Sequence, residues 1–395
     1  MTKRNVLLGI ALVALLGALG AAERALEQTA AAQAAGAKQA PRFEVDPFWP
    51  KPLPNHWVLG STIGVDVDSN DHVWIIHRGG PTMNPKEIYA TLTPKASECC
   101  VPAPPVLEFD QAGNLVHSWG GPGQGYEWPG SNHGITVSSK GVVWIGGNGG
   151  NDGQILTFTT DGKFLKQFGF AYPGGGSNDL WAFRQVAKIN LDEPNNEAYI
   201  ADGYGNKRVA VVDMDTGKIK RYWGAYGNRP DDTNIGRYNP TAPPAQQFRS
   251  PVHCAEKAAD GLVYVCDRAN DRIQVFRADG TFVKETFVDK DTLGDGSVWD
   301  IEFSKDPQQR FLYQNDGANE RINIFDRQSL ELLTSFGDGG RQPGQFYAVH
   351  SIAVDSRGNM YTTETYEGKR VQRFLYKGLA PVTTLRQGTT WPSQN

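Results

Sequence analysis

The sequence is poor in clustered charge of one sign and in long apolar runs, and both shortages restrict what the protein can be. Its formal net charge is −4 and no lysine or arginine run is long enough to follow a phosphate backbone, so nucleic-acid binding is not expected. The apolar run Val6–Leu19 is too short for a comfortable membrane span. Its 45 glycines and 11% aromatic residues indicate short strands and tight turns rather than long helices.

The N-terminus carries an export pattern. Lys3 and Arg4 precede the apolar run and small residues follow it, which is typical of a secretory signal peptide, predicted over residues 1–22. An uncleaved membrane anchor is the alternative. Residues 23–42 are rich in Ala and Gln and are predicted to form a linker. We therefore expect an exported protein, periplasmic or extracellular, with no stable membrane span after signal cleavage.

Cysteine is scarce, with four residues, and an exported chain permits disulfides. Cys254 begins one predicted strand and Cys266 ends the next, so a hairpin would bring them opposite each other. Cys99 and Cys100 are adjacent in a loop, where they form either a vicinal bridge or two free thiols. Adjacent cysteines without a partner Cys or His pair nearby are a poor zinc signature.

A unit of four short strands recurs along the mature sequence. Its second strand is rich in aromatic and β-branched residues, its third often starts Arg-Ile or Arg-Val, and its fourth often ends in an aromatic residue and Gly. Six units begin near residues 57, 131, 182, 249, 297 and 346. Because such units are unstable singly and a closed ring removes their exposed edges, the sequence predicts an all-β fold, one six-bladed β-propeller over residues 43–395.

Three parts of the chain do not follow the repeat. Insertions at Gly79–Pro105 and Ala225–Gln247 interrupt its rhythm, and long loops on one rim of a rigid scaffold usually shape a site. The segment 43–46 either completes the last blade or packs beneath it.

Histidine fills the same position in alternate units. His133, His253 and His350 each lie 11 residues before the aromatic residue of the following strand, in the second, fourth and sixth units. Innermost strands line a propeller's channel, so the three imidazoles would converge and leave a position for water or substrate, as catalytic zinc requires. A hydrogen-bonded channel histidine is the alternative for any one of them. Because only 7 of 395 residues are histidine, we predict a zinc site. The remaining histidines, predicted to be structural or exposed, are His56, His72, His77 and His117.

A second recurrent position lies in the loop after each unit's second strand. Arg78, Asn148 and Arg268 stand there, and Tyr204 and Tyr366 occupy it in units whose loop is one residue longer. An arginine can bind a carboxylate bidentately, and a tyrosine hydroxyl between cations and a metal ion can act as a base. Inter-blade hydrogen bonds and ion pairs are the alternative role.

The repeated units resemble NHL repeats, and the whole predicted propeller is similar to the peptidyl-α-hydroxyglycine α-amidating lyase family over roughly residues 57 to 376. The segments that carry the likeness are Ile76-His-Arg-Gly, Asn132-His-Gly-Ile, Ala201-Asp-Gly-Tyr-Gly-Asn-Lys-Arg, Val252-His-Cys-Ala, Cys266-Asp-Arg-Ala-Asn-Asp-Arg-Ile-Gln and Val349-His-Ser-Ile. The resemblance implies that the three repeat histidines hold zinc and that Tyr204 is the base. It also implies that Arg78 and Arg268 bind a substrate carboxylate and support the tyrosine. The implied reaction cleaves a carbinolamide N–C bond to an amide and glyoxylate.

The sequence departs from that family at several positions. Ser351 stands where the family has an Asp of a structural calcium site, which argues against calcium, although carbonyls near Val65 and Ile135 remain available to an ion. Ala348 replaces a Met of the substrate wall, and Gly205 replaces a half-cystine beside the tyrosine. The resemblance to the family therefore supports the fold and the metal-ligand residues better than it supports the family's substrate.

Three functions therefore remain open at this point. The first is a zinc-dependent carbon–nitrogen lyase of the amidating type, or a relative acting on another small hydroxylated carboxylate, so its partner is a small-molecule or peptide-derived substrate. The second is a metal-dependent hydrolase such as a lactonase, although such propellers usually hold their ion through carboxylates and Asn. The third is a non-enzymatic binding propeller with a structural metal, because fold alone does not determine function. The sequence carries no signal for an oligomeric state.

Overall fold

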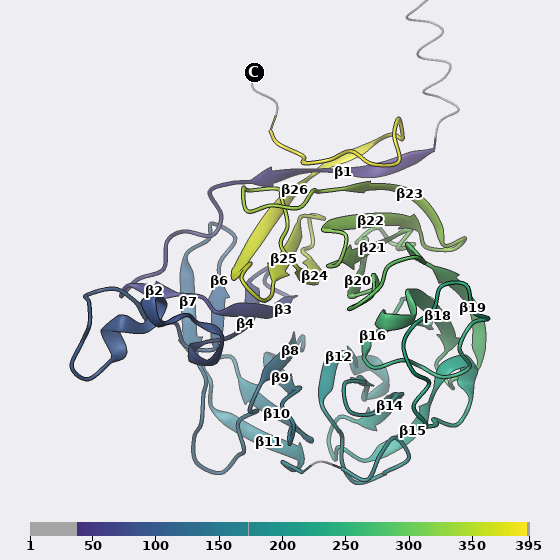
Figure 1. The fold of residues 1–395 in the computed structure, drawn as a ribbon, viewed down its shortest axis with the longest axis horizontal. Coiled ribbons are helices and arrows are strands. Elements are labelled where there is room, and N and C mark those ends of the chain that lie inside the picture. The colour runs from purple at the N-terminus through teal and green to yellow at the C-terminus, as the bar shows by residue number, and fades with distance from the viewer. Residues whose placement is uncertain (1–37, 173, 393–395) are drawn as a thin grey trace, which may run out of the picture.

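The chain folds into a ring of six four-stranded antiparallel sheets (Figure 1). The structure is a computed structural model that describes residues 38–172 and 174–392. Each innermost strand contacts the innermost strand of the next sheet, and β24 (Val349–Val354) contacts β3 (Ser61–Val67), so the ring is closed. The predicted all-β, six-bladed β-propeller is confirmed. The predicted signal peptide, residues 1–22, lies outside the described residues, and within the described ranges no helix is long and apolar enough to cross a membrane.

The blades are numbered in chain order and their strands are given from the axis outwards. Blade 1 consists of β3, β4 (Val73–Arg78), β6 (Val106–Phe109) and β7 (Leu115–Trp119). Blade 2 consists of β8 (Asn132–Val137), β9 (Val142–Gly147), β10 (Gln154–Thr159) and β11 (Phe164–Gly169). Blade 3 consists of β12 (Val186–Asp192), β13 (Glu197–Asp202), β14 (Arg208–Asp213) and β15 (Ile219–Trp223). Blade 4 consists of β16 (Val252–Lys257), β17 (Leu262–Asp267), β18 (Arg272–Arg277) and β19 (Phe282–Phe287). Blade 5 consists of β20 (Asp300–Phe303), β21 (Phe311–Asp316), β22 (Arg321–Asp326) and β23 (Glu331–Phe336). Blade 6 consists of β24, β25 (Met360–Glu364), β26 (Arg370–Pro381) and β1 (Gln39–Asp46).

The connections gather the long loops at one end of the ring. Because the strands of a blade alternate in direction, the loops after second strands and the links between blades leave at the end where innermost strands begin. Both predicted insertions lie at this end. Short elements in the connections are β2 (Trp57–Val58), which pairs with β5 (Val101–Pro102), and the 3-10 helices η1 (Gly80–Thr82), η2 (Pro85–Thr91), η3 (Glu193–Asn195), η4 (Ala225–Gly227) and η5 (Arg268–Asn270).

The apolar core is distributed between the blades. Six buried clusters each draw their side chains from two neighbouring blades, and one of them combines Trp74 of blade 1 with Ile135 and Ile145 of blade 2. The second-strand aromatic residues that marked the repeat fill these interfaces. Each blade therefore buries its faces only against its neighbours, which is why a single unit would be unstable.

The N-terminal strand closes the ring. β1 pairs with β26 as the outermost strand of blade 6, so the segment 43–46 completes the last blade (Figure 1). The strand begins at Gln39, inside the predicted linker 23–42, because its pairing with β26 extends to Gln39 opposite Pro381.

Both pairs of cysteines are disulfide-bonded. Cys254 and Cys266 face each other across β16 and β17, with their Cα atoms 4.8 Å apart, as the predicted hairpin required. Cys99 and Cys100 form a vicinal bridge in the first insertion, the first of the two alternatives.

Removing the aromatic anchor of β1 should weaken ring closure. Phe43 is 2% exposed and packs against Tyr313, Phe336 and Tyr376. We expect Phe43→Ala to lower the free energy of unfolding by about 3–5 kcal/mol in urea denaturation, since it leaves a cavity between blades. Phe48→Ala is the control, because that ring is 88% exposed. Equal stability of the two variants would contradict this account of closure.

Candidate metal centre

The three repeat histidines meet at the axis. His133, His253 and His350 belong to β8, β16 and β24, and each lies where the pairing of the innermost strand shifts register. A bulge of this kind re-aims a side chain. All three are at most 3% exposed, and their ring centroids are 4.8–5.1 Å apart.

A carbonyl of the next blade fixes the tautomer of each ring. The Nδ1 atoms of His133 and His350 lie 2.6 Å and 2.7 Å from the carbonyl oxygens of Ala187 and Ile63, and His253 Nδ1 contacts the carbonyl of Trp299. A carbonyl only accepts, so each Nδ1 carries the proton and each Nε2 presents a lone pair.

The acceptor residues complete an alternating pattern. Ile63 and Ala187 lie at the register shifts of blades 1 and 3, and Trp299 directly precedes β20 of blade 5. One position of the innermost strand therefore holds a donor imidazole in even blades and supplies an acceptor carbonyl in odd blades.

The electrostatic environment keeps these imidazoles neutral. Burial lowers the pKa of all three histidines well below the usual value. The positive charge of Arg268 lowers the pKa of each further, and Arg78 does so for His133 and His350. Neutral imidazoles retain the lone pair that a metal ion needs.

The donor set fits a metal ion such as zinc. Ligand atoms of the three histidines all lie within 4.8 Å of one another. The Tyr204 hydroxyl lies 3.0 Å from Nε2 of both His133 and His253, but its single proton can satisfy only one of these lone pairs. A cation bound by all three Nε2 atoms satisfies them together, and three imidazoles are a common catalytic zinc set.

Tyr204 connects the histidines to the rim. It lies in the turn between β13 and β14, and its hydroxyl accepts a hydrogen bond from Arg268 Nη1 at 3.2 Å. The Arg268 guanidinium is 4.6 Å from the ring centre of Trp299, and its Nη2 is 3.6 Å from Asp295. Arg268 is 7% exposed and its Nε has no hydrogen-bond partner among the described residues.

Arg78 approaches the same histidines from blade 1. Its Nε donates to the carbonyl of Asn132 at 3.0 Å and its Nη2 to Asn148 Oδ1 at 2.7 Å. Burial lowers the pKa of Arg78, while Tyr204 and Tyr366 oppose that shift. Both bonds of Arg78 go to neutral oxygens, and no carboxylate forms an ion pair with it within the described ranges.

The remaining rim residue, Tyr366, is half-exposed and its hydroxyl lies 3.2 Å from Asp295 Oδ2. The structure thus brings the six predicted site residues to one place and adds Trp299 and Asp295, which sequence reasoning missed. The sequence does contain a signal for Trp299, because this residue stands at the start of the first strand of the fifth unit. Asp295 had none, because it lies in an inter-blade link without repeat pattern.

The other histidines described lie away from this centre. His72 and His117 both contact Glu108, and His77 is buried between the amide of Gly60 and the carbonyl of Pro104. Burial lowers the pKa of His77 to about 4. The contacts of these three histidines are the structural ones expected from the sequence.

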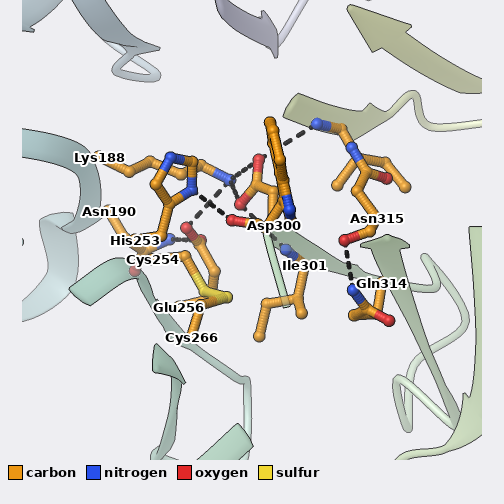
Figure 2. Close-up of a disulfide and its surroundings, with 12 residues drawn as sticks. Lys188, Asn190, His253, Cys254, Glu256, Cys266, Asp300, Ile301, Gln314 and Asn315 are labelled. Carbon is orange, nitrogen blue, oxygen red and sulfur yellow. Dashed lines mark hydrogen bonds and ion pairs between the residues drawn. A yellow bond between two sulfur atoms is a disulfide. The ribbon is translucent and has the colours of Figure 1, made fainter. Parts of the chain in front are cut away.

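A buried ion-pair network lies directly below the metal centre. Lys188, Asp300 and Ser351 each follow the residue at the aligned position in their blades. Lys188 Nζ is 2.8 Å and 3.0 Å from the Asp300 oxygens and 3.1 Å from Glu256, and Ser351 Oγ donates to Asp300 at 2.8 Å. Figure 2 shows Lys188 reaching these carboxylates beside the Cys254–Cys266 disulfide.

This network does not fit a calcium ion. Calcium needs several free oxygen ligands, whereas Asp300 and Glu256 already share the Lys188 ammonium as a counter-ion. Burial alone would lower the pKa of Lys188, but the attraction of Asp300 and Glu256 outweighs it and raises that pKa. Lys188 therefore places one positive charge between these carboxylates.

Comparison with known proteins agrees with the fold and the repeat. No family model matches the chain. It is 23% identical over 360 residues to peptidyl-alpha-hydroxyglycine alpha-amidating lyase 1 of Drosophila melanogaster, covering 85% of this chain but only 60% of that protein. It is 26% identical over 354 residues to NHL repeat-containing protein 3 of Mus musculus, covering 85% and 84%.

Solved structures support the architecture alone. A streptogramin B lyase matches with a TM-score of 0.51 and 13% identity, covering 85% of this chain and 98% of that one. A Bacteroides thetaiotaomicron protein of unknown function matches with a TM-score of 0.52 and 13% identity, covering 86% and 77%. The chain is a six-bladed β-propeller that resembles NHL-repeat proteins. Within that class its sequence is distantly similar to a peptidyl-α-hydroxyglycine α-amidating lyase.

Protonation of Glu256 should make stability depend on pH. Burial, opposed by Lys188, raises its pKa from 4.5 to about 7. A carboxyl with a raised folded-state pKa stabilises the fold below its unfolded pKa and loses that contribution as pH rises. We expect wild-type stability to decline between pH 4.5 and 7 more steeply than that of Glu256→Gln, measured by urea denaturation. Glu331→Gln, at an exposed carboxylate, should keep the wild-type slope, and identical slopes for all three proteins would refute the assignment.

Proposed function

We propose that the protein is a zinc-dependent lyase of the peptidyl-α-hydroxyglycine amidating type, or a relative acting on another small hydroxylated carboxylate. The observation that carries this proposal is the position of Tyr204. Its hydroxyl contacts Nε2 of two histidines and accepts a hydrogen bond from Arg268. A potential base and a metal-ligand set therefore share one small space, as proton removal from a substrate hydroxyl requires.

In this proposal each residue has a defined role. His133, His253 and His350 hold the zinc ion, which when bound polarises the substrate oxygen. Tyr204 takes the proton of the carbinol hydroxyl, the carbon–nitrogen bond breaks, and the carbinol oxygen becomes the aldehyde of glyoxylate. The leaving amide nitrogen receives a proton, which Tyr204 is positioned to return.

The rim arginines explain why the substrate would carry a carboxylate. Arg78 forms no ion pair, and the single carboxylate near Arg268 belongs to the half-exposed Asp295 at 3.6 Å. Arg78 has no ion pair and Arg268 has one long pair to a half-exposed carboxylate, so the two guanidinium groups favour an oxyanion between them. Arg268 also stabilises negative charge on the Tyr204 oxygen through its hydrogen bond.

The proposal includes export. Two disulfides are typical of a protein in an oxidising compartment, which agrees with the signal peptide predicted at residues 1–22. We propose a periplasmic or extracellular protein whose propeller domain acts without nucleic acid.

Substituting the base should abolish turnover without disturbing the metal. We expect Tyr204→Phe to lower kcat for an N-acyl-α-hydroxyglycine by about 10²–10⁴-fold, because general base catalysis is lost. Glyoxylate release is the assay, and zinc content is measured by mass spectrometry of the purified protein. Tyr376→Phe, on the outer strand β26, is the matched control. An active Tyr204→Phe protein would exclude this role, and lactone opening without glyoxylate release would favour a hydrolase.

Removing the charge of Arg78 should weaken substrate binding. A hydrogen bond to a charged group contributes about 1.5–3 kcal/mol, so Arg78→Gln should raise KM by about 10-fold to 100-fold. Zinc content should stay at the wild-type level, because Arg78 contacts no metal-facing Nε2 atom. An unchanged KM would remove Arg78 from the carboxylate site.

A further inference from the structure

A larger pocket lies beside the metal centre, against the second insertion, 225–247. It has a volume of about 580 Å³ and adjoins a cavity of about 310 Å³, with which it shares Ile235, Arg237, Tyr238 and Arg249. We call the two together the basic pocket. Its size suits a small organic group.

The basic pocket concentrates positive charge in a chain whose net charge is −4. Five cationic residues line it, Lys207, Arg237, Arg249, Arg272 and Lys290, and no Asp or Glu belongs to its lining. Arg272 is buried and forms ion pairs with Asp267 and Glu285. None of the other four forms a salt bridge with a described residue. Their contacts are to neutral groups: Lys207 Nζ donates to the carbonyl of Thr233 at 2.7 Å, and Arg249 Nε donates to Asn270 Oδ1 at 2.9 Å.

The basic pocket is continuous with the walls of the metal centre. Ser250 lines it and donates a hydrogen bond to the carbonyl of Tyr204 at 2.7 Å. Ala269, which directly follows Arg268, and Gly294, which directly precedes Asp295, line it as well. A molecule held between the rim arginines therefore has the basic pocket as its immediate neighbour.

Apolar groups accompany the cations. Ile235 and Tyr238 form one wall, and Leu293, which is 64% exposed, forms another. The side chain of Tyr238 also stacks with Arg249, whose guanidinium carbon is 5.9 Å from the ring centre. Such a surface suits a short carbon chain that ends in an anion.

We propose that the basic pocket binds a second oxyanion of the substrate, a carboxylate or a phosphate at the far end of its acyl group. The preferred substrate is then an N-acyl-α-hydroxyglycine with negative charge at both ends. One carboxylate lies at the rim arginines and the other anion at Arg237, Arg249 and Lys207. The substrate's identity rests on the proposed function, whereas anion binding by the basic pocket does not.

The test compares three N-acyl-α-hydroxyglycines of equal chain length, ending in a carboxylate, a phosphate or a neutral amide. We expect kcat/KM to be about 10-fold to 100-fold higher for at least one anionic end than for the neutral end. Arg237→Gln should remove most of that preference and leave kcat/KM for the neutral substrate unchanged. Lys207→Gln is the second variant, and the carboxylate and phosphate arms identify the anion. Arg357→Gln is the matched control, because this exposed arginine lies in the β24–β25 turn at the opposite end of the ring.

Calorimetry with the unreactive N-acylglycines separates the two proposals. If charged-end ligands bind more tightly and Arg237→Gln removes the difference, the basic pocket is an anion site even when no hydroxyglycine is turned over. In that case only the proposed function fails. Equal affinity for charged and neutral ends, or a preference that survives both substitutions, overturns the inference whatever the lyase assay shows.

Discussion

A hydrogen bond from an imidazole Nδ1 to a carbonyl of the next blade organises the centre of this propeller. It occurs at all three repeat histidines, with acceptors at the corresponding positions of Ile63, Ala187 and Trp299. The bond fixes the tautomer, turns Nε2 towards the axis and links two blades. Because a register shift in the strand places the histidines, backbone geometry and ligand chemistry are coupled.

Charge is arranged in layers along the axis. Arg78 and Arg268 lie above neutral imidazoles, and the Lys188 ammonium lies below them between Asp300 and Glu256. In the upper layer Arg78 has no ion pair and Arg268 pairs only with the half-exposed Asp295, so this layer favours an anionic ligand at the mouth. In the lower layer, Asp300 and Glu256 share the Lys188 ammonium. The metal centre and the floor of the channel therefore differ in character although they are separated by only one residue along each strand.

Much of this arrangement follows from the repeat in the sequence. A constant spacing between histidine and the next aromatic residue was enough to predict their convergence, because equivalent positions of a closed ring lie at one height. The same spacing did not identify Trp299. The turn between β20 and β21 is longer than the corresponding turns, so Trp299 lies further from Tyr313 in the sequence. The insertion 225–247 was expected to shape a site, but the cationic lining of the basic pocket and Asp295 were not predicted. Asp295 and most of the pocket lie in inter-blade links, whose paths depend on packing that no periodic pattern records.

The closing bond at His350 crosses the boundary between the last and first blades, where its Nδ1 meets the carbonyl of Ile63. β1 pairs with β26 inside blade 6, so the N-terminal strand completes the blade that precedes this boundary. No contiguous fragment short of the full circle can assemble the three nitrogens in this way. The histidine centre therefore depends on the closed ring of blades rather than on any one stretch of sequence. A circularly permuted chain opened at another blade junction would form the same centre.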